Sequence, residues 1–258
     1  MSKKIEETTE LATAGTTELS TVGSMGDYME ELDGLGSLSF EKIKIPSGGG
    51  IAFEVPGDDP ESPEIQKAIE GVIVHHQTKN VYFRDAYTGA TEEGNQPDCA
   101  SADGKTGVMR DSGTEKSCAT CKYNQFGSGR DGFGKACQNR VDLYILMDGE
   151  VFPKVLSLPA TSLKDFKAYL AMRVVARKQK LCQVRTRITL KKAKSKSGID
   201  YSTCVFAKAG DVPQDQLPDI LEMKELCRGI ALSQAFQAVE EQEYTDLTAT
   251  TDEELPFD

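Results

Sequence analysis

The chain has 258 residues, of which 38% are hydrophobic, with no Trp and a formal net charge of −11 at pH 7. This length and composition favour one compact domain with a modest core and flexible ends. No run of about 18 apolar residues occurs and no apolar stretch follows the charged N-terminus, which excludes a membrane-spanning helix and a secretion signal. We therefore expect a soluble cytoplasmic protein without a membrane partner.

Charge is divided unevenly along the chain. Residues 1–70 carry five Lys against fifteen Asp and Glu, whereas residues 151–210 carry fourteen Lys and Arg against two Asp. Residues 211–258 are acidic again, with thirteen Asp and Glu against two basic residues. Because the basic block stands directly before an acidic end, the negative total does not exclude a nucleic-acid partner.

The first half of the chain predicts short strands. Residues 1–36 hold too few hydrophobic side chains to order themselves, so we expect a flexible acidic arm. Apolar and polar residues alternate in 38–45, and a Gly-rich turn leads to a second strand at 51–55. The β-branched run 65–76 and the segment 81–83 should form a hairpin.

The clearest hairpin signal follows a long Gly-rich stretch. Residues 141–147 and 151–158 flank Asp148-Gly149, a turn pair typical of hairpins. Two further strands are predicted at 181–190 and 199–206, joined by a basic loop.

Two helices are also predicted. Thr161 and Ser162, with Asp165 three residues after Ser162, indicate the start of a helix over 163–177, whose apolar residues recur at spacings of three and four. A final helix is expected over 215–239.

Four of the seven cysteines lie in the Gly-rich stretch with the spacing C-x18-C-x2-C-x15-C, namely Cys99, Cys118, Cys121 and Cys137. A Cys-x-x-Cys pair can wrap around a tetrahedral zinc ion, for which thiolates are good ligands. A connection of this length has no apolar core of its own, and metal binding would stabilise it. We predict a structural Zn²⁺; a redox Cys-x-x-Cys pair and unpaired cysteines are the alternatives.

The remaining candidates for metal binding or catalysis are few. A catalytic zinc would need an open position with His, Asp or Glu beside it, and the two histidines, His75 and His76, should point to opposite faces of a strand. Cys182, Cys204 and Cys227 are expected to fill apolar space. No phosphate-binding Gly loop, nucleophile with a His partner or recognisable pair of carboxylates occurs, so we do not expect an enzyme.

The predicted fold is mainly β (α+β): an OB-fold-like barrel with an inserted four-cysteine zinc ribbon, a C-terminal helix and disordered termini. In an oligonucleotide-binding barrel a helix precedes the last hairpin, as it does here. A β-sandwich is the competing interpretation, but the helix is better explained as the plug of a barrel end. The predicted boundaries are 1–36 for the arm, 37–210 for the core with its insertion at about 84–140, 211–239 for the C-terminal helix and 240–258 for a disordered acidic tail.

Single-stranded DNA is bound by a cationic groove and by exposed rings on which bases stack. The predicted cationic contacts are Arg185, Arg187, Lys191, Lys192, Lys194 and Lys196. The aromatic candidates are Tyr82, Phe83, Tyr87, Tyr123, Phe126, Phe133, Tyr144, Phe152 and Tyr201. Among them we prefer Tyr82, Tyr87, Tyr144 and Tyr201, because a hydroxyl group tolerates exposure.

The chain ends in an acidic run and a hydrophobic tip. Asp252, Glu253 and Glu254 precede Leu255, Pro256 and Phe257, and Asp258 follows them. This end resembles the tails of bacterial single-stranded DNA-binding proteins, which finish in acidic residues and Ile-Pro-Phe, and those of bacteriophage replication proteins of the same function. The resemblance implies that residues 252–257 recruit replication or recombination proteins and that the tail competes with DNA for the basic groove. It also implies the host cytoplasm as the location if a bacteriophage encodes the protein.

The function predicted from these features is non-enzymatic binding of single-stranded DNA in replication, recombination or repair. One alternative is a zinc-ribbon transcription or processing factor that binds duplex DNA or RNA. Another is a protein–protein adaptor whose basic block meets an acidic partner. The oligomeric state is not predicted.

Overall fold

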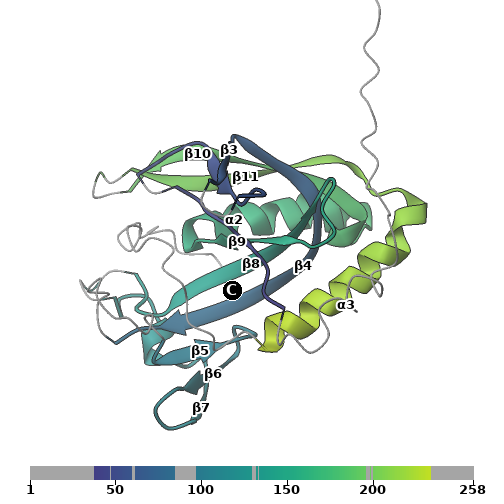
Figure 1. Ribbon diagram of the computed structural model, residues 1–258. Coiled ribbons are helices and arrows are strands. Elements are labelled where there is room, and N and C mark those ends of the chain that lie inside the picture. Colours follow the sequence, from purple (N-terminus) through teal and green to yellow (C-terminus); the bar gives the residue numbers. More distant parts are fainter. Residues whose placement is uncertain are drawn as a thin grey trace, which may run out of the picture.

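A computed structural model of the chain (Figure 1) describes residues 38–233 apart from 47, 60–61, 85–96, 130–131, 133, 196–197 and 199. The predicted arm at 1–36 and the predicted tail at 240–258 lie outside the described residues. The described part is mainly β, as predicted, with one large mixed sheet and a C-terminal helix.

Strand β4 (Ala68–Tyr82) organises this sheet. One edge pairs with β8 (Gln138–Met147) along almost its whole length, while the other edge pairs first with β10 (Val184–Lys194) and then with β5 (Cys99–Ser101). A Cβ atom on Gly71 would lie 2.4 Å from a backbone oxygen of β8, so only glycine fits where these two strands approach. The predicted hairpin between 65–76 and 81–83 is wrong, because the polar residues between them continue the ladder with β8.

The other strands extend this frame on both sides. Strand β9 pairs with β8 in the predicted hairpin, β1 runs parallel to β9, and β11 pairs with β10. Beyond β5, the short strands β6 and β7 form a lobe that sequence periodicity did not predict, and β2 and β3 form a separate ribbon. Their bounds are β1 Lys42–Ile43, β2 Phe53–Val55, β3 Glu64–Gln66, β6 Thr106–Met109, β7 Glu115–Ser117, β9 Lys154–Leu158 and β11 Asp200–Asp211.

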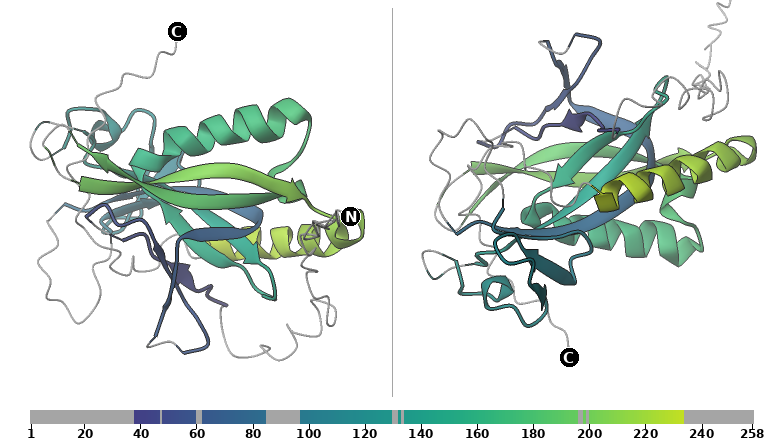
Figure 2. Two further views of the ribbon diagram at one scale, coloured as in Figure 1. Left: turned by 90° about the horizontal axis from the view of Figure 1, so that it is seen from above. Right: turned by 60° about the horizontal axis from the view of Figure 1, so that its bottom comes forward.

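The predicted barrel is not found, because the pairing among the described strands leaves the sheet open. Helix α2 (Ala160–Tyr169) lies alongside the β10–β11 hairpin and against the free edge of β11 (Figure 2, left). Its Phe166 and Tyr169 rings pack on Phe206 of that strand. The helix therefore occupies the edge that strand pairing would need for closure.

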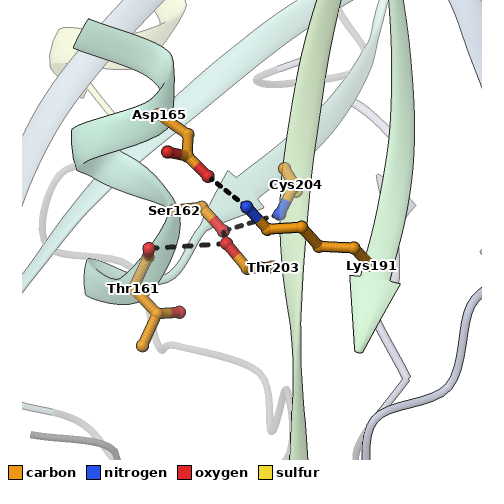
Figure 3. A network of polar contacts seen from close by, with 6 residues as sticks. All are labelled: Thr161, Ser162, Asp165, Lys191, Thr203 and Cys204. Atoms are coloured by element: carbon orange, nitrogen blue, oxygen red, sulfur yellow. Dashed lines mark hydrogen bonds and ion pairs between the residues drawn. The ribbon is translucent and has the colours of Figure 1, made fainter. Parts of the chain in front are cut away.

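The helix predicted at 163–177 is present but begins earlier. It runs from α2 through a π-helical turn, η2 (Leu170–Val174), into a 3₁₀ turn, η3 (Val175–Arg177). Ser162 does not cap this helix, since Pro159 takes the capping position and the Ser162 hydroxyl accepts a hydrogen bond from the Cys204 N–H at 3.0 Å (Figure 3).

Two apolar clusters lie on opposite faces of the β4–β8–β9 sheet. One is enclosed by α2, β10 and β11, and the other lies beneath α3 (Leu217–Ser233), which is preceded by the 3₁₀ turn η5 (Gln214–Gln216) (Figure 2, right). Ile220, Met223 and Cys227 recur at helical spacing and are buried on the second face. Within the described ranges, no helix has the length and apolar character needed to cross a membrane.

Candidate nucleic-acid interface and cysteine cluster

The four predicted zinc ligands come from neighbouring parts of one lobe, which contains β5, β6 and β7 and is called the cysteine lobe below. Cys99 starts β5, Cys118 directly follows β7, Cys121 precedes the 3₁₀ helix η1 (Lys122–Asn124), and Cys137 directly precedes β8. Backbone hydrogen bonds set the turns between them: the Cys118 N–H donates to the Lys105 carbonyl at 2.7 Å and the Cys137 N–H to the Tyr123 carbonyl at 2.8 Å.

The four thiol groups lie near one another. A Cβ atom on Gly107 would lie 3.0 Å from Cys99 Sγ and 3.5 Å from Cys118 Sγ, so both sulfur atoms lie over this glycine. Burial, and then the neighbouring thiolates of Cys118, Cys121 and Cys99, raise the pKa of Cys137 to about 12. All seven cysteines are free, and no three Cys, His, Asp or Glu side chains of the described ranges are arranged so that they could hold a metal ion.

The lobe is fastened to the sheet by side chains at its base. The Tyr123 ring stacks on Tyr82 of β4 with 4.1 Å between centroids. Asn139 of β8 donates to the side-chain oxygens of Asn80 and Asn124, and Asn80 donates to the Gly104 carbonyl at 3.0 Å. These contacts fix the orientation of the lobe relative to β4 and β8.

The histidines and the other three cysteines have structural surroundings. The His75 ring lies beside Tyr144, whereas the His76 ring lies beside Phe166 in the opposite apolar cluster, so the two point to different faces as predicted. Burial lowers the pKa of both histidines, and nearby positive charges lower it further. The prediction that Cys182, Cys204 and Cys227 fill apolar space is confirmed, since all three are buried.

The two predicted arginines on β10 differ in accessibility. The Arg185 side chain is only 16% exposed and donates to Asp148 Oδ2 at 2.6 Å, so its charge is already satisfied inside the protein. The Arg187 side chain is 54% exposed and lies 3.3 Å from Glu70. Of the two, Arg187 is the more exposed, and its partner Glu70 is exposed as well.

The predicted lysines gather toward the end of the β10–β11 hairpin, and each described one has an acidic partner. Lys191 lies 3.2 Å from Asp165 of α2 (Figure 3). Lys192 and Lys194 share Asp200, at 2.7 and 3.8 Å, and the bond from Lys192 is the main reason that the pKa of Asp200 is lowered. The sixth predicted cation, Lys196, lies outside the described residues.

The preferred aromatic candidates mostly point inward. Tyr144 is 4% exposed and packs edge-on against Phe40, so it has no face for a base. Tyr82 is buried under Tyr123. Tyr201, at the start of β11, is half-buried, and Tyr87 lies outside the described residues.

Other cationic side chains lie on the sheet where sequence reasoning did not place a site. Lys79 of β4 and Arg140 of β8 are opposite one another in register, and Lys79 forms an ion pair with Asp142. Sequence reasoning missed these residues because both lie outside the predicted strands, one between 76 and 81 and the other just before 141. In the structure both are strand positions.

Comparison with known protein families, with curated proteins and with solved structures finds no match to this chain. Its function is therefore inferred from its own residues and their arrangement.

Proposed function

We propose that this protein binds single-stranded DNA without catalysing a reaction, and that it acts in replication, recombination or repair. The observation that carries the proposal is the order β4, β8, β9, α2, β10, β11, with β10 returning to pair with β4. This order is the one expected of an oligonucleotide-binding fold, and it supports the proposal. Such a fold is a partly open five-stranded barrel that binds oligonucleotides on its second and third strands and on the loops after its first and fourth strands.

Positively charged side chains near the two corresponding loops of this chain support a binding face there. The first of these loops, 83–137, contains the cysteine lobe, and the second, 195–199, joins β10 to β11. The strands β5, β6 and β7 of the lobe lie at the lower left of Figure 1, and ends of β10 and β11 lie at the upper left. Lys79 and Arg140 lie beside the first loop, and Lys192 and Lys194 beside the second. A single strand that runs between the two loops would meet cations at both ends.

The ion pairs of the exposed cations do not oppose this proposal. Exposed pairs contribute about 0–1 kcal/mol each, so a phosphate can replace a carboxylate at little cost. Residues 151–210 also carry twelve more basic than acidic residues, so this segment has a large positive charge of its own. Salt-sensitive binding is expected, because bound phosphates release counterions.

A structural Zn²⁺ held by Cys99, Cys118, Cys121 and Cys137 is part of the proposal. Cys99 and Cys118 place their sulfur atoms beside Gly107, in a lobe with three short strands. With Cys121 and Cys137 they supply four soft ligands of the kind that this ion prefers. The ion would supply a cross-link between the two ends of the lobe and favour the thiolate forms. The chain's own contribution is the set of hydrogen-bonded turns at Cys118 and Cys137.

The acidic tail completes the proposal. Asp252, Glu253 and Glu254 would compete with DNA for the cationic face, and Leu255, Pro256 and Phe257 would recruit replication or recombination proteins in the cytoplasm. The support for this part is the composition of the tail and its resemblance to the tails described above.

The test is fluorescence anisotropy with a labelled oligo-dT of about 30 nucleotides at several salt concentrations, with duplex of the same length as competitor. R187A should weaken binding and reduce the salt slope by about one. R228A is the matched control, because Arg228 is also an exposed arginine paired with a glutamate but lies on α3. Equal displacement by duplex would favour the transcription or processing factor, and binding no stronger than that of a generic polycation would favour the adaptor.

A further inference from the structure

Phe126, in the cysteine lobe, is the only aromatic residue among the large hydrophobic side chains that are strongly exposed in the described chain. It is 69% exposed. A single exposed hydrophobic residue is common on protein surfaces and needs no explanation by itself. The backbone and the charges around Phe126 distinguish it from such a residue.

The turn that carries Phe126 is rigidly held. The Gly127 N–H donates to the Gly134 carbonyl at 2.7 Å, and the Gln125 side chain donates to the Ala119 carbonyl at 2.8 Å. The Ser128 hydroxyl accepts from the Ala136 N–H at 3.0 Å and donates to the Gln125 carbonyl at 2.6 Å. The Phe126 ring is therefore presented to solvent by an ordered turn.

Cations lie over the rings of this turn. Lys135 Nζ is 5.2 Å from the centroid of Phe126, and Lys122 Nζ is 4.9 Å from the centroid of Tyr123. Residues 116–140 contain five Lys and Arg and a single acidic residue, Asp131. Rings with adjacent cations are the combination that binds single strands without sequence preference, because a base stacks while its phosphate is neutralised.

We propose that Phe126 is a stacking platform for a base of single-stranded DNA, with Lys135 and Lys122 contacting the flanking phosphates. The proposal rests on the proposed function and extends the interface from the β10–β11 hairpin to the cysteine lobe. Tyr123, which lies three residues before Phe126, is half-buried and stacks on Tyr82 of β4, so it holds the lobe against the sheet.

A single substitution reports stacking directly, because the protein contains no Trp. In F126W the new indole should be quenched when oligo-dT is added, and should not be quenched by an abasic strand of the same length. M172W is the matched control, since Met172 is also 69% exposed but lies on the helix η2. Its emission should not change; equal quenching in M172W, or equal quenching by the abasic strand, would overturn the proposal.

Affinity provides an independent measurement. F126A should bind oligo-dT roughly 5- to 150-fold more weakly, the range expected for loss of one base–aromatic stack. F126L should lose affinity to a similar extent, because it keeps apolar volume but has no ring face. If the wild type binds oligo-dT but F126A and F126L bind equally well, the stacking role is refuted and the proposed function stands. If the wild type itself does not bind, both fail.

Discussion

Arg185 and Arg187 lie two positions apart on β10, yet burial gives them different roles. Arg185 is held by Asp148, whose second carboxylate oxygen is buried and has no hydrogen-bond partner in the described part of the chain. Arg187 extends into solvent, where its ion pair with Glu70 is weakly held. The same side-chain type is thus held inside the protein at one position and exposed to solvent at the other.

Replacement of Arg185 by Ala should destabilise the protein by about 1–3 kcal/mol, because it leaves the Asp148 carboxylate partly buried without its counter-charge. The measurement is urea denaturation. R187A serves as the comparison and should change the free energy of unfolding by less than about 0.5 kcal/mol while it changes the salt slope of DNA binding. The assignment would be wrong if R185A altered the salt slope and left stability intact.

Gly107 lies directly beside the sulfur atoms of Cys99 and Cys118. A Cβ atom there would lie 3.0 Å from Cys99 Sγ, closer than side chains ordinarily approach. We expect G107A to displace this thiol, to lower the zinc content of the purified protein and to lower its melting temperature. Zinc would be measured by a colorimetric chelator after the protein is unfolded.

The control for G107A is G229A. A Cβ atom on Gly229, in α3, would meet nothing within 4 Å, and alanine in a helix is favoured over glycine by about 1 kcal/mol. This variant should keep its zinc and melt at the same or a higher temperature. Full zinc occupancy in G107A would show that the thiols do not converge on a metal beside this glycine.

Helix α2 and strand β11 are joined by a small polar network. Ser162 is buried; its hydroxyl accepts from the Cys204 N–H and lies 3.3 Å from the Thr203 hydroxyl (Figure 3). On the surface, Lys191 reaches Asp165 of the helix. A strand edge left open invites pairing with other chains, so a helix bonded to this edge also protects it.

We expect S162A to lower the free energy of unfolding by about 1–3 kcal/mol, because the Cys204 N–H loses its acceptor in a buried site. Chemical denaturation followed by circular dichroism would measure the loss. S112A is the control, since Ser112 is exposed and accepts a long bond of 3.4 Å from the Thr114 N–H. Equal stabilities of the two variants would mean that water or the backbone replaces the Ser162 hydroxyl.

Strands with a two-residue pattern and clear turns could be predicted, and short strands could not. The β8–β9 hairpin has Asp148-Gly149 at its turn and long apolar runs on both sides, so local signals agree with the tertiary structure. Strands β5, β6 and β7 have only three or four residues each, too few for a repeating pattern. They extend the sheet from the edge of β4 at Asn80 to Tyr82. No local pattern encodes that edge.

The molecule as a whole separates its charges into a basic core segment and acidic ends. Residues 211–258 carry eleven more acidic than basic residues, close in size to the excess of positive charge in residues 151–210. Such an end is expected to screen the cationic face at low ionic strength.

Removal of residues 240–258 should therefore tighten binding to oligo-dT at low salt, and the difference from the full chain should shrink as salt rises. Anisotropy titrations of the two proteins at matched salt concentrations would measure it. A second truncation that ends before Asp252 separates the tip from the rest of the acidic segment. If affinity and salt slope are unchanged in both, the tail does not compete with DNA.

The sequence by itself determined the mainly β class, the last two hairpins, both helices and the candidate set of cysteines, because periodicity, turn residues and Cys spacing are local properties. Only the tertiary structure decided that 68–82 is one strand, that α2 lies along the edge of β11, and that Tyr144 and Arg185 face inward while Phe126 faces solvent. These outcomes depend on which surfaces meet. Burial and long-range pairing are set by contacts between residues far apart in the chain, so a residue's own type and neighbours do not specify them.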